Sequence, residues 1–270
     1  GMSRTAVIAG QGGLAPAVIA ALDDPLVYAL DGFAPPVPAT PFRLERLVPF
    51  LDRLIEHGVD RVIFAGAVRR PRLDPEAFDP RTAQLVPRIL TALQSGDDAA
   101  LRMVLDIFEE HGLTICGVDQ IAPDLVPEAG ILTGAPTDSD RRDAARAARI
   151  LSHMGDLDLG QGAVVAQGLC MALEPQPGTA AMLDFAACHT GLRPDPTGAK
   201  GVFYKAPKPG QDRRVDLPTI GPDSVDQAAA ADLAGIAWQA GGVILLDRQQ
   251  TVQRARAAGL FLWARPQEGI

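Results

Sequence analysis

The first half of the chain alternates short apolar runs with longer segments of helical periodicity. Each apolar run is hydrophobic throughout, which is typical of strands in a parallel sheet covered on both faces. The strands expected on this ground are residues 5–9, 26–30, 61–65 and 113–116. The helices expected between them are residues 15–22, 42–57, 82–94 and 97–111. Ligands of such a sheet bind beyond the carboxyl ends of its strands, so the candidate ligand-binding turns are 10–14, 66–71 and 96–98.

A segment rich in proline and glycine separates this half from a less regular α/β region. Residues 123–137 are predicted to be an interdomain linker. The elements expected after it are helices at 138–154, 180–189, 224–240 and 252–258 and strands at 163–173, 202–204, 243–246 and 261–263. We therefore predict an α/β protein of two domains, with a Rossmann-like parallel sheet in residues 2–122, a second α/β domain in residues 138–270, and the ligand in the cleft between them. Gly1, which precedes Met2, is interpreted as the remnant of a cleaved tag.

Charge and cysteine content narrow the class of function. The net charge is −8, and a surface this acidic repels a phosphate backbone, so no nucleic acid is expected as a partner. The apolar run that ends at Gly10 is too short for a signal peptide or a membrane span. We expect a cytoplasmic protein whose membrane contact is peripheral. Cys116, Cys170 and Cys188 lack metal-ligand spacing and are expected to be buried packing residues.

The richest cluster of charge lies in the segment from Lys205 to Gly221. It holds Lys208, Arg214 and other cations, and Asp216 and Thr219 follow within a proline-stiffened stretch. Cationic donors offset the charge of a pyrophosphate, and an acid can hold Mg²⁺ or orient water. A solvated, charged connector would have the same composition. From spacing alone the two interpretations are balanced.

Three glycine turns are further candidates. Gly10-Gln11-Gly12-Gly13 follows a strand and opens a helix, which suits a phosphate or ribose, although it is not the full dinucleotide fingerprint and a tight turn would look the same. Asp31 follows the second predicted strand, where a dinucleotide site has an acidic residue, so a dinucleotide site remains possible. In Gly96-Asp97-Asp98, we favour Asp97 as a helix N-cap over a metal or sugar ligand. Gly160-Gln161-Gly162 either contacts a ligand or supplies bends.

The segment from Lys205-Ala-Pro-Lys-Pro to Arg214-Val-Asp-Leu-Pro-Thr-Ile-Gly221 resembles the LpxI family. Other stretches agree in order and extend the resemblance over almost the whole chain. They are Gly10-Gln-Gly-Gly-Leu-Ala-Pro16, Phe64-Ala-Gly-Ala-Val-Arg-Arg-Pro71, Gly96-Asp-Asp-Ala99, Leu157-Asp-Leu-Gly-Gln-Gly-Ala-Val-Val165, Leu233-Ala-Gly-Ile236 and Gly259-Leu-Phe261.

The resemblance implies a function and a set of site residues. LpxI proteins of Gram-negative bacteria hydrolyse UDP-2,3-diacylglucosamine to UMP and 2,3-diacylglucosamine 1-phosphate (lipid X) in lipid A biosynthesis, with Mg²⁺ or Mn²⁺. The partner would be this UDP-linked diacylated glucosamine, met at the cytoplasmic face of the inner membrane, and a homodimer is left open. Asp216 would be the catalytic residue of the C-terminal domain and the candidate metal ligand. The implied substrate-binding residues are Gly10, Gly12, Gly13, Leu14, Val68, Arg70, Gln161, Thr179, Lys205, Lys208, Arg214 and Thr219.

The chain departs from the family pattern at a few positions. Ala67 stands where an Asn is frequent, Gln167 where a Glu is frequent, and Pro177-Gly-Thr-Ala180 where Glu-Gly-Thr-Asp is typical. If either lost acid binds metal in the family, this chain is impaired, altered in substrate, or uses Asp184 or Glu174 instead. One alternative is therefore a non-catalytic paralogue that binds a nucleotide sugar. A second is a nicotinamide-dependent oxidoreductase that uses the glycine turn and Asp31, although it would leave the segment from Lys205 to Gly221 unexplained.

Overall fold

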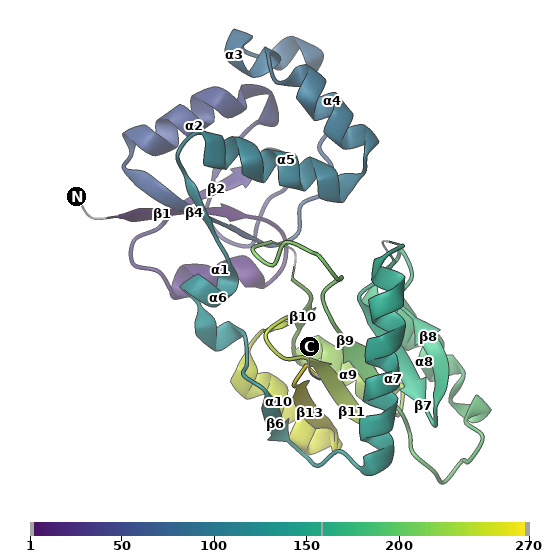
Figure 1. Ribbon diagram of the computed structural model, residues 1–270. Coiled ribbons are helices and arrows are strands. Elements are labelled where there is room, and N and C mark those ends of the chain that lie inside the picture. Colours follow the sequence, from purple (N-terminus) through teal and green to yellow (C-terminus); the bar gives the residue numbers. More distant parts are fainter. Residues whose placement is uncertain (1–2, 158, 216, 268–270) are drawn as a thin grey trace. The chain divides into compact units, whose positions relative to one another are not determined.

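The computed structural model describes residues 3–157, 159–215 and 217–267. The chain divides into two compact units, which are described one at a time (Figure 1). The N-terminal unit is formed by the chain up to Ala122 together with Arg214 and Val215. The C-terminal unit begins at Pro123 and takes most of the remainder.

The N-terminal unit is built around a five-stranded sheet in the order β3-β2-β1-β4-β5, with every pairing parallel. Its strands are β1 (Arg4–Ala9), β2 (Leu26–Leu30), β3 (Thr40–Phe42), β4 (Val59–Ala65) and β5 (Thr114–Cys116). Its helices are α1 (Leu14–Ala20), α2 (Leu47–Glu56), α3 (Pro80–Ala83), α4 (Val86–Gln94), α5 (Asp97–Glu110) and α6 (Val118–Ile121), with 3-10 turns at Leu44–Arg46 and Pro75–Ala77. The strand order reverses between β1 and β4, and open α/β sheets bind ligands at such a point.

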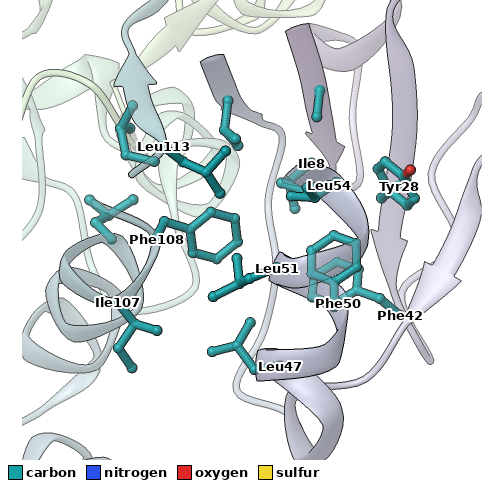
Figure 2. Close-up of a cluster of buried hydrophobic side chains, with 14 of the residues drawn as sticks. Ile8, Tyr28, Phe42, Leu47, Phe50, Leu51, Leu54, Ile107, Phe108 and Leu113 are labelled. Carbon is teal, nitrogen blue, oxygen red and sulfur yellow. The ribbon is translucent and has the colours of Figure 1, made fainter. Parts of the chain in front are cut away.

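A core of large apolar side chains joins this sheet to α2 and α5 (Figure 2). Phe50 of α2 stacks on Phe42 of β3 with ring centroids 4.2 Å apart, and Phe108 of α5 meets Phe50 edge-on. Burial of these rings and of neighbours such as Leu51 and Leu54 fixes the helices on the sheet. Val215 belongs to the same core, which explains why this distant segment groups with the N-terminal unit.

The C-terminal unit contains a mixed six-stranded sheet in the order β6-β13-β11-β9-β7-β8 and a small sheet that pairs β10 with β12. In the larger sheet β9, β11 and β13 are parallel, and β6 and β7 run antiparallel to their neighbours. Its strands are β6 (Gly130–Thr133), β7 (Gly162–Ala166), β8 (Leu169–Leu173), β9 (Val202–Lys205), β10 (Thr219–Ile220), β11 (Gly235–Gln239), β12 (Ile244–Leu245) and β13 (Phe261–Arg265). Its helices are α7 (Asp138–Gly155), α8 (Thr179–Cys188), α9 (Pro222–Ala230) and α10 (Arg248–Ala258), with 3-10 turns at Pro123–Leu125 and Thr190–Leu192.

Helices cover both faces of the mixed sheet. One buried cluster joins α7 to one face, and a second joins α8, α9 and α10 to the other. The predicted fold class, two α/β domains of which the first has a parallel sheet, is confirmed. Strand β6 lies within the segment expected to be a linker, where it pairs with β13.

Two predicted elements of the C-terminal unit were wrong. The single strand expected at 163–173 is a hairpin, because Gln167 and Gly168 both take positive φ (51° and 78°), as a two-residue type I′ turn requires. The helix expected at 224–240 ends with α9, because Asp232 at φ 55° leaves helical geometry. The rest of that stretch contains the buried strand β11.

Smaller differences occur in the N-terminal unit. Strand β3 was not predicted, and the helices expected at 42–57 and 82–94 are each broken near their first turn. Among the cysteines, Cys116 is buried, but Cys170 and Cys188 are exposed, so the expectation of burial was wrong for both.

Candidate functional site

A buried lysine stands at the carboxyl end of β9. Lys205 is 8% exposed, and its Nζ donates to the carbonyl oxygen of Thr219 on β10 at 2.8 Å. Burial lowers the pKa of Lys205, and the nearby Glu174 carboxylate opposes that shift. Lysine side chains are rarely buried in proteins. A buried lysine whose pKa is shifted and that lies near a carboxylate is therefore a candidate functional residue.

Glu174, which follows β8, connects the residues around this lysine. Its Oε2 accepts from the Thr179 hydroxyl at 2.8 Å, and its Oε1 accepts from the Gln161 backbone N–H at 3.4 Å. Its own N–H donates to the Gly162 carbonyl oxygen at 2.9 Å. One carboxylate therefore orients Thr179 and Gln161 and shares the electrostatic surroundings of Lys205.

The glycine before Gln161 is required by this packing, and the glycine after it is tightly packed. A Cβ on Gly160 would lie 2.4 Å from the Glu174 carbonyl oxygen, and a Cβ on Gly162 would lie 3.1 Å from Glu174 Oε2. Between them, the Gln161 carbonyl accepts from Ala206 N–H at 3.0 Å, next to Lys205. Gly160-Gln161-Gly162 is thus a close-packed turn that holds Gln161 beside the end of β9.

The segment after Lys205 folds back onto Gln161. Gln161 Nε2 donates to Gln211 Oε1 at 2.7 Å, and the Lys208 backbone N–H donates to the same oxygen at 3.1 Å. The C-terminal unit therefore brings together Gln161, Thr179, Lys205, Lys208 and Thr219 from four stretches of chain. Gln211 and Glu174 link them, and neither was among the predicted site residues.

Arg214 is placed differently from these residues. Its guanidinium donates to the Glu109 carboxylate of α5 at 2.9 Å, and it groups with Val215 in the N-terminal unit. Asp216, the predicted catalytic residue, lies outside the described residues. Within the described ranges there is no group of three or more His, Cys, Asp or Glu side chains that could hold a metal ion.

The glycine turn of the N-terminal unit lies at the strand-order reversal. Gln11 and Ala67 form a two-way bridge, each N–H donating to the other's carbonyl at 2.9 Å. A Cβ on Gly10 would lie 2.6 Å from the Ala67 carbonyl oxygen, and a Cβ on Gly66 would lie 2.7 Å from the Gly10 carbonyl carbon. The turns after β1 and β4 can approach this closely only because Gly10 and Gly66 have no side chain. Four other predicted residues of this unit lie in or next to these turns: Gly12, Gly13, Leu14 and Val68.

Arg70 is tied to the start of α5. Its guanidinium donates to Asp97 Oδ1 at 2.6 and 2.9 Å. The N-cap of that helix is Gly96, at φ 107°, and Asp97 is its first residue. The expectation that Asp97 caps the helix was therefore wrong, because its carboxylate binds Arg70 instead.

Comparison with known families agrees with the motifs. The model of the LpxI N-terminal domain matches residues 4–125, and that of the LpxI C-terminal domain matches residues 128–263. The chain belongs to the LpxI family. The UDP-2,3-diacylglucosamine pyrophosphatase LpxI of Caulobacter vibrioides is 41% identical to it over 214 residues, which cover 78% of this chain and 76% of that protein.

One departure from the LpxI pattern has a structural role in this chain. Gln167 Nε2 donates to the carbonyl oxygens of Asp195 and Ala199 at 2.8 and 3.0 Å, and its Oε1 accepts from Asp195 N–H at 2.9 Å. A carboxylate could not make the two donations. Gln167 therefore joins the β7–β8 turn to the loop before β9, and this bonding explains an amide at the position.

Proposed function

We propose that this chain hydrolyses the pyrophosphate of UDP-2,3-diacylglucosamine, giving UMP and 2,3-diacylglucosamine 1-phosphate in lipid A biosynthesis. Membership of the LpxI family and the name of the Caulobacter relative support the substrate. The observation that carries the proposal is the group around buried Lys205, because it offers a fixed cation beside oriented polar side chains.

Lys205 would donate from Nζ to an oxygen of the pyrophosphate. A charge held in a site shielded from water interacts more strongly with developing negative charge than one in solvent, and it needs no reorganisation during the reaction. The Thr179 hydroxyl and the Gln161 side chain would orient the neighbouring part of the substrate. Glu174 holds the Thr179 hydroxyl and the Gln161 backbone N–H in place, and its charge favours the protonated form of Lys205.

Asp216 is the proposed catalytic carboxylate and metal ligand. The described residues provide no preformed cage of acidic ligands. Mg²⁺ needs none, because it commonly binds through one or two carboxylates, waters and substrate phosphates. A single aspartate together with the pyrophosphate oxygens fits this mode for Mg²⁺ or Mn²⁺. A bound divalent ion would supply charge neutralisation at the phosphoryl oxygens.

The glycine turn at Gly10–Gly13 would receive the nucleotide or sugar part of the substrate. Its position at the strand-order reversal supports this role, since ligands of parallel sheets bind there. An oxidoreductase that uses the same turn has less support. Family membership disfavours it, and the segment from Lys205 to Gly221 would have no part in hydride transfer.

The test is turnover of diacylated UDP-glucosamine with Mg²⁺ or Mn²⁺, followed by phosphorus NMR for UMP. Asp216→Ala should nearly abolish product formation while the thermal transition and substrate binding persist. Asp216→Asn removes the charge at constant shape and should behave in the same way. Asp223→Asn, which changes an exposed carboxylate on α9, is the matched control. Tight binding without turnover by the unmodified chain would establish the non-catalytic paralogue instead.

A further inference from the structure

A row of arginines follows the exposed face of α7. Arg142, Arg146 and Arg149 are spaced four and three residues apart, so they lie on one stripe of the helix. The buried stripe of α7, which contains Ala144, Ala147, Leu151 and Met154, packs on the sheet. We call the three residues the α7 arginine row.

The guanidinium groups of the row differ from those of nine other arginines, which are held in ion pairs. Ion pairs hold Arg4, Arg43, Arg70, Arg81, Arg88, Arg102, Arg193, Arg214 and Arg254. Across residues 3–157, 159–215 and 217–267, no carboxylate lies within 4.0 Å of a row guanidinium. In a chain of net charge −8, the row places three cations without a direct ion pair on one stripe of α7. The acidic residues of the same helix are Asp138, Asp140 and Asp143.

Exposed leucines gather at the C-terminal end of the row. Leu157 and Leu159, which follow α7, are 71% and 48% exposed. Leu173 of β8 is 41% exposed, and it pairs with Ala163, whose side chain belongs to the cluster under α7. Leu173 therefore points to the face of the sheet that α7 covers.

The β7–β8 turn and α7 are in contact. The buried Asp143 carboxylate of α7 accepts from the backbone N–H groups of Gln167 and Gly168 at 3.0 and 2.8 Å. Figure 1 shows α7 lying lengthwise beside β7 and β8. The arginine row and the three leucines thus belong to one surface, which we call the α7 surface.

The leucine end of this surface adjoins the candidate site. Gly155, at the end of α7, packs closely on Pro209 in the segment that carries Lys208. A Cβ at Gly155 would lie 2.1 Å from Pro209 Cδ. Gly160, one residue beyond Leu159, packs against Glu174. A lipid met at these leucines would therefore be close to the groups that surround Lys205.

We propose that the α7 surface docks this protein on a membrane that contains anionic lipids. Arginines at the level of the lipid phosphates and leucines at the acyl boundary form the combination that holds peripheral proteins at a bilayer. The biological reason for docking rests on the proposed function, since a diacylated substrate resides in a membrane. Among the described residues, no helix has the length and apolar character to cross a bilayer, and docking does not require one.

The test is pelleting of the full chain with phosphatidylglycerol–phosphatidylethanolamine vesicles and with neutral phosphatidylcholine vesicles. Binding is expected on the anionic vesicles and should weaken as salt is added. The variant Arg142→Gln/Arg146→Gln/Arg149→Gln should bind about 100-fold more weakly, because each arginine near an anionic surface contributes roughly fivefold. Leu157→Ser/Leu159→Ser should weaken the binding that remains at high salt.

A matched triple variant controls for net charge. Arg248→Gln/Arg254→Gln/Arg256→Gln removes the same charge from α10, on the opposite face of the sheet, and should bind like the unmodified chain. Equal losses in the two triple variants, or no binding of the unmodified chain to anionic vesicles, would overturn the proposal. So would an α7 triple variant that keeps vesicle binding but loses self-association, because the surface would then join two copies.

Two further measurements separate docking from folding and from catalysis. If the α7 triple variant loses its thermal transition, the three single variants replace it, and each should bind anionic vesicles about fivefold more weakly. Vesicle binding that is unchanged in all three single variants would contradict docking. Turnover of substrate dispersed in detergent should be unchanged in the α7 triple variant. Absence of turnover in the unmodified chain would contradict the proposed function, while the vesicle result, measured without substrate, would still stand.

Discussion

The Lys205 ammonium and the Thr219 carbonyl oxygen lie 2.8 Å apart and close the segment that carries Lys208, Arg214 and Asp216. Lys205 ends β9 in the larger sheet, and Thr219 begins β10 in the smaller one. This hydrogen bond therefore fixes both ends of the segment on the same unit, although Arg214 and Val215 group with the other. The buried charge that makes the bond is also the group proposed to meet the pyrophosphate.

Replacement of Lys205 separates this catalytic role from a structural one. Lys205→Met should lower kcat/KM by an amount equivalent to about 2–4 kcal/mol, the range for one lost donor to transition-state charge. The thermal transition should persist, since the desolvation energy that an apolar chain of similar length avoids offsets the lost hydrogen bond to Thr219. Lys200→Met, at an exposed lysine of the same unit, is the control. Activity equal to that of the unmodified chain would contradict the role given to Lys205.

The lowered pKa of Lys205 predicts opposite effects of pH on activity and on stability. Catalysis needs the ammonium, so kcat/KM should fall as pH rises through a value below the ordinary lysine pKa of about 10.4. Between the folded and the unfolded pKa the unfolded chain binds more protons, so this group makes the free energy of unfolding rise with pH. Because the Glu174 charge raises the pKa of Lys205, Glu174→Gln should move the alkaline limb of the activity profile lower. A limb that stays in place would show that Glu174 acts only through packing.

The sequence predicted most of the regular elements, because buried parallel strands have strong, uniform apolar patterns. It failed where one or two residues change the backbone direction within an apolar stretch. Gln167-Gly168 and Asp232 are such positions, and their positive φ values separate elements that composition alone would join. Charge clustering and the glycine turns marked Lys205 and Gln161 as candidates, and the motif resemblance added Thr179. Glu174 was not placed among the site residues, because its contacts depend on how the hairpin returns to Gly160.

The β7–β8 turn provides a second test within the C-terminal unit. Asp143→Ala leaves the Gln167 and Gly168 N–H groups without their buried acceptor. Loss of such an acceptor costs about 1–3 kcal/mol for each donor left unsatisfied, so the free energy of unfolding should fall by an amount of this order. Denaturant unfolding measures it, with Asp184→Ala at an exposed position of α8 as the control. Equal unfolding midpoints in the two variants would show that the turn forms without Asp143.

Gly160→Ala tests the packing that orients the candidate site. The new Cβ would lie 2.4 Å from the Glu174 carbonyl oxygen and 2.6 Å from its Cβ, so the backbone on one side must move. Such overpacking typically costs about 1–3 kcal/mol, and the displacement should also disturb the hydrogen bond from Thr179 to Glu174. We therefore expect a lower melting temperature and a lower kcat/KM in the same variant. Gly191→Ala is the matched control, because a Cβ there meets nothing within 4 Å and its φ is not positive. If Gly160→Ala retains the activity and stability of Gly191→Ala, the contact between Gly160 and Glu174 does not position the site.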